Sequence, residues 1–284
     1  MLSKQTWRKL SATLATILLY FQLLRIISNP GAQVANGGGG GGSDDEKDRF
    51  MRSNHDSIQI AKETNKQIQK SHGTSMNRYP DEYLAIKLYL DHDLDSIPKR
   101  KILSFGSSTG EEAITLASLY FNSEKHEDYR IYAVDIDEPT LTIARKNAEK
   151  YNTPESKIHF FNGIETNIDV YGEYDVIFAN SVLCFHGSGN AGFASMYEAI
   201  TTRFPFEDFE STLLTLDASL KEGGLLAIVN SNYEFGDSNV SRRYEAVAQC
   251  EGNFVPKVDA EKKMLVELDM KVRRDCVWVK TASI

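Results

Sequence analysis

The chain has 284 residues, of which 41% are hydrophobic, and its formal net charge is −8. This length and apolar content allow one sizeable packed domain with extensions. A general nucleic-acid binder normally carries a basic face, so the acidic balance leads us to expect no nucleic-acid partner. The three cysteines, Cys184, Cys250 and Cys276, lack the spacing of a metal or redox motif. We therefore expect them to be reduced and mostly buried, without a disulfide framework, and we expect no metal site.

The first segment, residues 1–43, is expected to lie outside the folded domain as a targeting or membrane-anchor segment with a linker. Basic residues precede an apolar run, and residues 10–27 form the expected membrane segment. Three interpretations remain open: a spanning anchor, a secretory signal peptide and an organelle transit peptide. We predict a single-pass N-terminal anchor, with organelle targeting or secretion after cleavage as the alternatives. The glycine run at 37–42 then predicts a flexible linker.

Two further regions follow in the chain. Residues 44–97 are expected to form a polar stem and a helical N-terminal extension, and residues 98–284 the main domain. Within the extension, Tyr79-Pro80 followed by acidic residues predicts the start of a helix that runs to about His92.

The main domain shows apolar strand-like runs that alternate with helical patterns. This alternation predicts an α/β fold with a Rossmann-like, doubly wound, mostly parallel sheet. The last two strand-like segments, 264–270 and 275–280, are expected to close the sheet as an antiparallel pair. The other expected strands are 101–105, 129–134, 158–161, 174–179 and 225–229, and the expected helices begin near Glu111 and Pro139 and span 209–220.

A turn of small residues follows the first strand of this domain. Gly106 and Gly110 bracket Ser107, Ser108 and Thr109, and two glutamates then open a helix. The turn has neither the Gly-Lys-Ser/Thr of a P-loop nor the second glycine of G-x-G-x-x-G. Glutamates at this point would repel a pyrophosphate and suit a ligand with a cationic end. The sequence therefore predicts a nucleotide-type site for such a ligand.

Polar residues also stand at the ends of the next strands. Asp135 follows the second strand, Asn162 the third and Asn180 the fourth. Because ligands of open parallel sheets bind beyond the carboxyl ends of the strands, we expect these residues to meet at one site. An acid at the position of Asp135 can accept hydrogen bonds from both hydroxyls of a ribose.

Four segments carry a resemblance to one enzyme family. These are SSTGEEAITLA at 107–117, VDIDEPTLTIARK at 134–146, YDVIFANSVLCF at 174–185 and KEGGLLAIVNSNYEF at 221–235. From about Met76 to Gly236 the chain resembles the class I, Rossmann-like S-adenosylmethionine-dependent methyltransferases. It is most similar to the chemotaxis-receptor (CheR-type) glutamate methyltransferases.

This resemblance implies S-adenosyl-L-methionine as the cofactor and assigns residues to it. The methionine part would be surrounded by the turn after the first strand, and its carboxylate would be held by Arg78. Asp135 would take the ribose hydroxyls, with Ile136 beside the adenine and Asn162 near its amine. The cofactor-binding residues predicted in this way are Arg78, Gly106, Ser107, Thr109, Gly110, Glu111, Asp135, Ile136, Asn162 and Asn180.

The chain also departs from the family pattern. Asn180-Ser181 stands where the family has Arg-Asn, and Phe185 lacks the hydroxyl of the expected tyrosine. Methyl transfer is an in-line displacement that chiefly requires alignment of the nucleophile, and His186 is the candidate base.

We predict methyl transfer to a protein carboxylate or a small-molecule acceptor. Two alternatives remain. One is a non-catalytic cofactor-binding module of methyltransferase fold. The other is a membrane-anchored glycosyltransferase that uses Asp135 and Asp137 to bind a metal.

Overall fold

The computed structural model describes residues 73–92, 100–122, 129–184, 205–251, 257–259, 264–266 and 273–282. The predicted anchor at 10–27, the glycine linker and the polar stem lie outside the described residues, as do Phe185 and His186. Within the described part of the chain, no helix is both long enough and apolar enough to cross a membrane.

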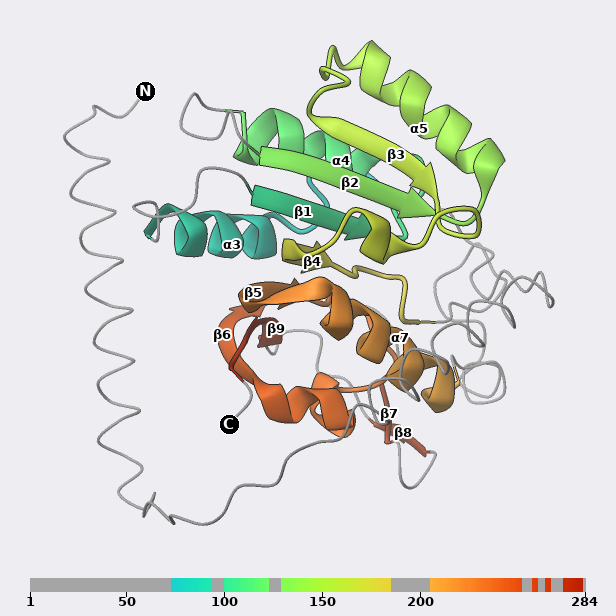
Figure 1. Ribbon diagram of the computed structural model, residues 1–284. Coiled ribbons are helices and arrows are strands. Elements are labelled where there is room, and N and C mark those ends of the chain that lie inside the picture. The colour runs from blue at the N-terminus through green and yellow to red at the C-terminus, as the bar shows by residue number, and fades with distance from the viewer. Residues whose placement is uncertain are drawn as a thin grey trace. The chain divides into compact units, whose positions relative to one another are not determined.

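A seven-stranded sheet forms the centre of the domain, in the order β3-β2-β1-β4-β5-β9-β6 (Figure 1). The first five strands in this order are parallel, and β9 is antiparallel to both of its neighbours, β5 and β6. This arrangement confirms the predicted Rossmann-like sheet with a closing antiparallel strand. The bounds are β1 Arg100–Phe105, β2 Tyr129–Asp135, β3 Ile158–Asn162, β4 Tyr174–Phe178, β5 Leu220–Ala227, β6 Tyr244–Cys250 and β9 Arg274–Lys280.

Helices cover both faces of this sheet. One apolar cluster joins one side of the sheet to the helices α3 and α4, and a second joins the other side to α7. All five residues of β4 are buried, as expected for a parallel strand covered on both faces. The helices are α3 Pro80–His92, α4 Glu111–Thr115, α5 Glu138–Lys150 and α7 Phe206–Ser219, with a π-helical turn η1 Leu116–Tyr120 and the 3-10 turns η3 Ile168–Val170, η4 Phe235–Asp237 and η5 Asn239–Arg243.

Helix α3 is packed into the same core as the sheet. Tyr83, Ile86 and Leu90 are buried in the cluster that also contains Ile102 of β1 and Val176 of β4. Their i, i+3, i+7 spacing gives the helix one apolar stripe, which is what attaches a surface helix to a core. This packing holds the residues near the amino end of α3 against the carboxyl ends of β4 and β5.

The predicted pairing of 264–270 with 275–280 is wrong. The strand β8, Met264–Val266, pairs instead with β7, Lys257–Asp259, in a separate two-stranded sheet. Strand β9 lies between β5 and β6, and β6 had not been expected as a strand. The middle of β9 is buried, so it requires hydrogen-bonding neighbours on both edges.

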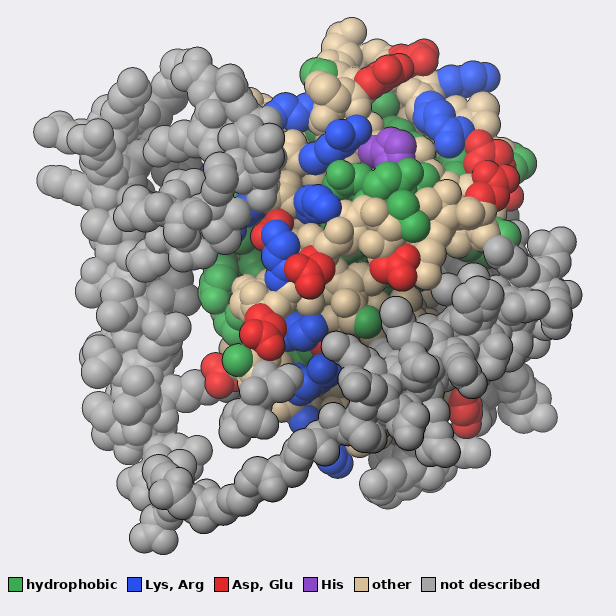
Figure 2. All heavy atoms as spheres, viewed as in Figure 1, with side chains coloured by type: hydrophobic (Ala, Val, Ile, Leu, Met, Phe, Trp, Pro, Cys, Tyr) green, Lys and Arg blue, Asp and Glu red, His purple; other side chains and the backbone are tan. Residues whose placement is uncertain are grey.

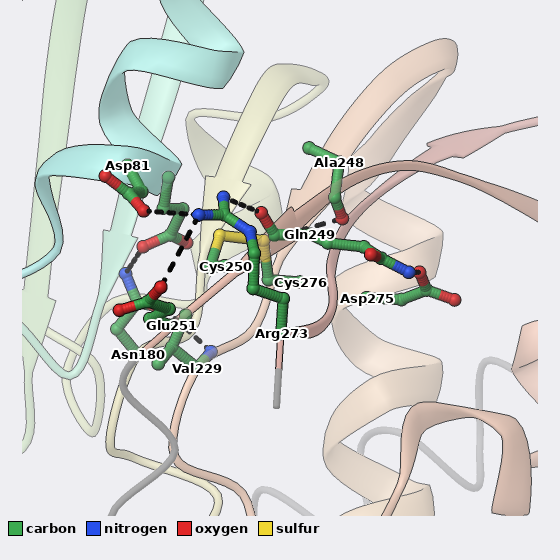
Figure 3. The surroundings of a disulfide bond; sticks show 11 residues. Asp81, Asn180, Val229, Ala248, Gln249, Cys250, Glu251, Arg273, Asp275 and Cys276 are labelled. Carbon is green, nitrogen blue, oxygen red and sulfur yellow. Dashed lines mark hydrogen bonds and ion pairs between the residues drawn. A yellow bond between two sulfur atoms is a disulfide. The ribbon is translucent and has the colours of Figure 1, made fainter. Parts of the chain in front are cut away.

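The expectation of reduced cysteines is also wrong for two of the three. Cys250 of β6 and Cys276 of β9 form a disulfide although 26 residues separate them in the sequence (Figure 3). Antiparallel pairing of the two strands brings the distant cysteines together. Cys184 is not part of a disulfide, and all three cysteines are buried as expected.

Charged side chains of both signs are interspersed over the described part of the face drawn in Figure 2. Pairs such as Arg145 with Glu138, 2.7 Å apart, are half exposed or nearly so and contribute little to stability. Buried Asp217 is different, because Arg243, Lys280 and the Tyr244 hydroxyl all contact its carboxylate. This cluster fastens α7 to β6 and β9.

Candidate functional site

The turn between β1 and α4 is fastened to the end of β2. The backbone N–H groups of Gly106 and Ser107 both donate to the carbonyl of Val134, at 2.9 and 2.8 Å. Gly106 and Gly110 adopt φ angles of 73° and 90°, which residues with a Cβ seldom adopt. A Cβ on Gly110 would lie 3.0 Å from the Cβ of Ala144 in α5. The two glycines therefore allow a tight turn over the carboxyl end of the sheet.

Asp135, at the end of β2, braces this turn with its carboxylate. One oxygen accepts the N–H of Ser108 at 2.8 Å, and the other accepts the N–H of Asp137 at 3.1 Å. Each carboxylate oxygen can accept a second hydrogen bond, and the side chain is only half-buried. The group is thus fixed in place while it keeps the capacity to accept from two neighbouring hydroxyls.

Asp137 has a different task from Asp135. It is the N-cap of α5, and its carboxylate accepts the backbone N–H of Thr140 at 3.0 Å. Capping satisfies an amide that the first turn of a helix would leave unpaired. The acid pair at 135 and 137 therefore has a structural explanation that involves no metal. Among the described residues, no group of three or more His, Cys, Asp or Glu side chains is arranged to hold a metal ion.

Ile136 and Asn162 lie together beyond the ends of β2 and β3. Ile136 is 45% exposed, so it offers an apolar surface on which a flat ring can pack. Asn162 is buried and builds the adjoining turn, because its Oδ1 accepts the N–H of Ile164 at 2.9 Å. Its Nδ2 lies 3.4 Å from the carbonyl oxygen of Ile136. The predicted contact of Asn162 with an adenine amine stays a prediction.

The two glutamates at the start of α4 point to different partners. Glu111 accepts a hydrogen bond from the hydroxyl of Thr109 at 2.6 Å, within the turn itself. Glu112 instead accepts from Ser104 at 2.7 Å, from Asn180 at 2.8 Å and from Tyr83 at 3.2 Å. Burial raises the pKa of Glu112 above its ordinary value.

Asn180, after β4, joins Glu112 to a second carboxyl group. Its Nδ2 donates to Glu112 and also, at 2.9 Å, to Glu82 of α3. Its Oδ1 accepts the N–H of Val229 at 3.0 Å, and Figure 3 shows Asn180 between Val229 and the helix. Glu82 is fully buried, and burial followed by repulsion from Glu112 raises its pKa well above the ordinary value. The sequence analysis gave Glu112 only as one of two glutamates that suit a cationic ligand, and it did not include Glu82.

A second polar group lies at the ends of β4 and β5. The hydroxyls of Tyr79 and Ser181 are 2.6 Å apart, and the Nδ2 of Asn230 donates to both, at 2.8 and 2.9 Å. These bonds tie the residue that precedes α3 to two strand ends. The wall of the site on this side is therefore built from hydroxyl and amide groups.

Arg78 lies at the entrance to α3, beside Tyr79. Its Nη1 donates to the carbonyl of Gly73 at 2.5 Å, and its guanidinium lies 5.2 Å from the centre of the Tyr79 ring. Its positive charge also lowers the pKa of Glu112, although burial outweighs this effect. The assignment of Arg78 to the carboxylate of the cofactor stays a prediction, and His186 lies outside the described residues.

Comparison with known families identifies the segment that carries this geometry. The sequence model of the CheR methyltransferase, SAM binding domain, matches residues 78–159. That span runs from Arg78 through β1, α4, β2 and α5 into β3 and contains the turn, Asp135 and Ile136. Residues 78–159 carry the SAM-binding part of a CheR-type methyltransferase domain. The predicted resemblance is thereby confirmed, and the cofactor of this domain is S-adenosyl-L-methionine.

Three solved structures show a weak similarity to the chain. Among solved structures, TrmN from Thermus thermophilus is 19% identical with a TM-score of 0.39, over 72% of this chain and 52% of that one. A protein-L-isoaspartate O-methyltransferase is 18% identical with a TM-score of 0.27, over 51% and 35%. The methyltransferase SibL is 15% identical with a TM-score of 0.29, over 54% and 36%. The present chain thus spans about half or less of each of these proteins, and no curated protein matches it.

The residues of this methyltransferase domain fit the cofactor chemically. Asp135 supplies fixed acceptors for a diol, and the exposed side chain of Ile136 suits an aromatic ring. The carboxyl groups of Glu111 and Glu112 suit the cationic methionine end, since neither pairs with a lysine or arginine in the described part of the chain. Of the predicted cofactor residues, all ten lie in the described ranges, and nine stand at the ends of β1 to β4.

Proposed function

We propose that the protein transfers the methyl group of S-adenosylmethionine to a small-molecule acceptor or to a carboxylate of a protein. The observation that carries this proposal is the pair of backbone hydrogen bonds that fix the Asp135 carboxylate beside the turn after β1, within the matched CheR-type segment. It supports ribose binding at the end of β2 and a methionine end that lies over β1. The methyl group would then face the ends of β4 and β5.

The chain's own residues would act mainly by binding and alignment. When bound, the cofactor supplies a methyl group that its positively charged sulfur already activates. Asp135 would hold the ribose, and Ile136 would pack on the ring. Arg78 would hold the carboxylate at the methionine end. Fixing the acceptor in line with the carbon–sulfur bond supplies much of the rate enhancement of such a displacement. Tyr79, with its hydroxyl held by Ser181 and Asn230, would line the acceptor side of the site.

The test is a transfer assay with cofactor labelled in the methyl group. The full chain is incubated with an extract of small metabolites and, separately, with extracted protein. Label in the small-molecule fraction or in base-labile protein esters supports one or the other acceptor class. An Asp135→Ala variant serves as the negative control. Cofactor binding without any transfer would support the non-catalytic module instead, and a folded chain that binds no cofactor would overturn the proposal.

We also propose that residues 10–27 anchor the protein in a membrane with the methyltransferase domain on the side away from the cytoplasm. The charge pattern of the N-terminal segment supports this orientation, and the Cys250–Cys276 disulfide supports an oxidising compartment. Protease protection of the domain in sealed membrane vesicles would agree with the proposal. Digestion of the domain from the cytoplasmic side would contradict it.

A further inference from the structure

A motif for N-linked glycosylation stands apart from the cofactor site. Asn239-Val240-Ser241 is the only Asn-x-Ser/Thr sequence in the chain, and its middle residue is not proline. We propose that Asn239 is a modification site that carries an N-linked oligosaccharide. The inference rests on the proposed orientation, in which the domain lies on the side of the membrane away from the cytoplasm, and it does not depend on methyl transfer.

The first observation is the exposure of the acceptor asparagine. Asn239 is exposed at the start of the 3-10 turn η5. Its backbone N–H donates to Glu210 of α7 at 3.1 Å, whereas its side-chain amide makes no hydrogen bond to any described residue. An oligosaccharide attached to this amide therefore breaks no hydrogen bond in the described part of the chain.

The second observation is the way in which the turn is held on the domain. Val240 is 2% exposed and packs in the apolar cluster that includes the buried face of α7. Its backbone N–H donates to the Oγ of Ser238 at 3.1 Å. Asp237 and Arg242, on either side of the motif, are exposed. The buried valine thus fixes the turn while Asn239 stays at the surface.

The third observation concerns the compartment. An N-linked acceptor asparagine is a surface residue of a protein that enters the secretory pathway, where disulfides also form. In the same domain, Cys250 and Cys276 form a disulfide. The acceptor motif and the disulfide are separate features of the sequence, and both agree with the same compartment.

The modification is the transfer of an oligosaccharide to the amide. The Nδ2 of Asn239 forms a bond to C1 of the first sugar, and the bond between this C1 and the diphosphate of a lipid-linked oligosaccharide breaks. The amide gives up one proton, and the lipid diphosphate leaves. The donor is thus an oligosaccharide carried on a lipid diphosphate, and the step needs no oxidant or reductant.

The position of the turn separates the oligosaccharide from the cofactor. The turn η5 leads into β6, which is one edge of the sheet, whereas Asp135 ends β2, which is next to the other edge. Val240 packs on the face of the sheet that α7 covers, and α3 and α4 cover the opposite face. We therefore expect the oligosaccharide to leave the affinity for the cofactor unchanged.

The test produces the full chain in cultured eukaryotic cells, whose secretory pathway carries out this transfer. Sealed membrane vesicles are isolated, and the electrophoretic mobility of the chain is compared before and after digestion with peptide N-glycosidase. The variants Asn239→Gln and Ser241→Ala each remove the motif, and Ser241→Thr preserves it. The matched control is Asn122→Gln, which replaces another exposed asparagine whose sequence, Asn-Ser-Glu, is not an acceptor motif.

We expect the wild type to show a single shift in mobility, which the glycosidase abolishes. The shift should be absent from Asn239→Gln and Ser241→Ala and present in Ser241→Thr and in the control. An unshifted wild type in vesicles that protect the domain from protease would overturn the inference while the proposed orientation stands. A shift that persists in Asn239→Gln would place the oligosaccharide elsewhere and would also overturn it.

A second measurement separates this inference from the proposed methyl transfer. Calorimetric titration with S-adenosylhomocysteine should give the same Kd before and after digestion with the glycosidase. If the folded chain carries the oligosaccharide at Asn239 but binds no cofactor in either form, the proposed function fails and the modification site stands. A domain that is digested from the cytoplasmic side and carries no oligosaccharide would overturn the orientation and the modification site together.

Discussion

Replacing Asp135 by alanine should separate cofactor binding from stability when it is compared with Asp137→Ala. Both residues are aspartates at the end of β2, two positions apart. Asp135 accepts N–H bonds from Ser108 and Asp137 and is free to accept ribose hydroxyls, whereas Asp137 only caps α5. The two substitutions therefore remove the same chemical group from neighbouring positions with different tasks.

The magnitudes follow from these contacts. Hydrogen bonds to a charged group contribute about 1.5–3 kcal/mol each, and less where water can replace the partner. For half-buried Asp135, we expect the free energy of unfolding to fall by about 2 kcal/mol and cofactor binding to weaken by about 2–3 kcal/mol, or roughly 30- to 150-fold. Loss of the N-cap at Asp137 should cost about 1 kcal/mol of stability and leave cofactor affinity unchanged.

Urea unfolding gives the stability of each variant, and calorimetric titration with S-adenosylhomocysteine gives the affinity. The reasoning is refuted if Asp135→Ala retains wild-type affinity while folded. It is also refuted if Asp137→Ala loses as much affinity as Asp135→Ala. In that second case, the two carboxylates would act together on one ligand, as in the alternative of a metal-dependent glycosyltransferase, and a manganese titration would be the next measurement.

Three further predictions concern stability and its dependence on pH and redox state. Gly110→Ala and Gly223→Ala both place a Cβ at positive φ. The Cβ added at Gly110 would lie 3.0 Å from the Cβ of Ala144 in α5, whereas the one added at Gly223 would have nothing within 4 Å. Urea unfolding should therefore show a loss of about 1 kcal/mol for Gly223→Ala and at least about 2 kcal/mol for Gly110→Ala, and equal losses would contradict the packing described. Burial raises the pKa of Glu82, so the folded state keeps its proton to a higher pH than the unfolded chain, and stability falls as pH rises above the unfolded value of about 4.3. Glu82→Gln should thus be more stable than the wild type at about pH 8, with the difference shrinking toward about pH 4, and a pH-independent difference would argue against a protonated Glu82. Reducing the Cys250–Cys276 disulfide, which closes a loop with a sequence separation of 26, should lower the free energy of unfolding by about 3 kcal/mol; identical thermal unfolding with and without reductant would show that the bond is absent or without effect.

The elements that carry the cofactor site could be predicted because their signals are local. In the sequence, a buried strand such as β4 is a short apolar run, and the glycines around Ser107 indicate the turn after β1. Asp135 could be placed because the end of a parallel strand fixes which edge of the sheet a residue occupies. These features depend on residues that are neighbours in sequence.

The features that could not be predicted depend on contacts between distant segments. The carboxyl of Glu82 joins the site only because α3 packs its apolar stripe on the sheet. In the sequence alone, Glu82 looks like any acidic residue in the first turn of a helix. Cys250 and Cys276 meet because β6, a half-exposed strand of weak pattern, pairs with β9. The expected hairpin at 264–280 followed from nearness in sequence, whereas β9 takes its partners from further upstream.

The most direct test of the account is a calorimetric titration of the full wild-type chain with S-adenosylhomocysteine, after cooperative unfolding has shown that the chain is folded. The account predicts saturable binding of one molecule per chain, with displacement by S-adenosylmethionine. A folded chain that takes up neither molecule would contradict the assignment of the β1–α4 turn and Asp135 as a cofactor site, and with it the proposed methyl transfer.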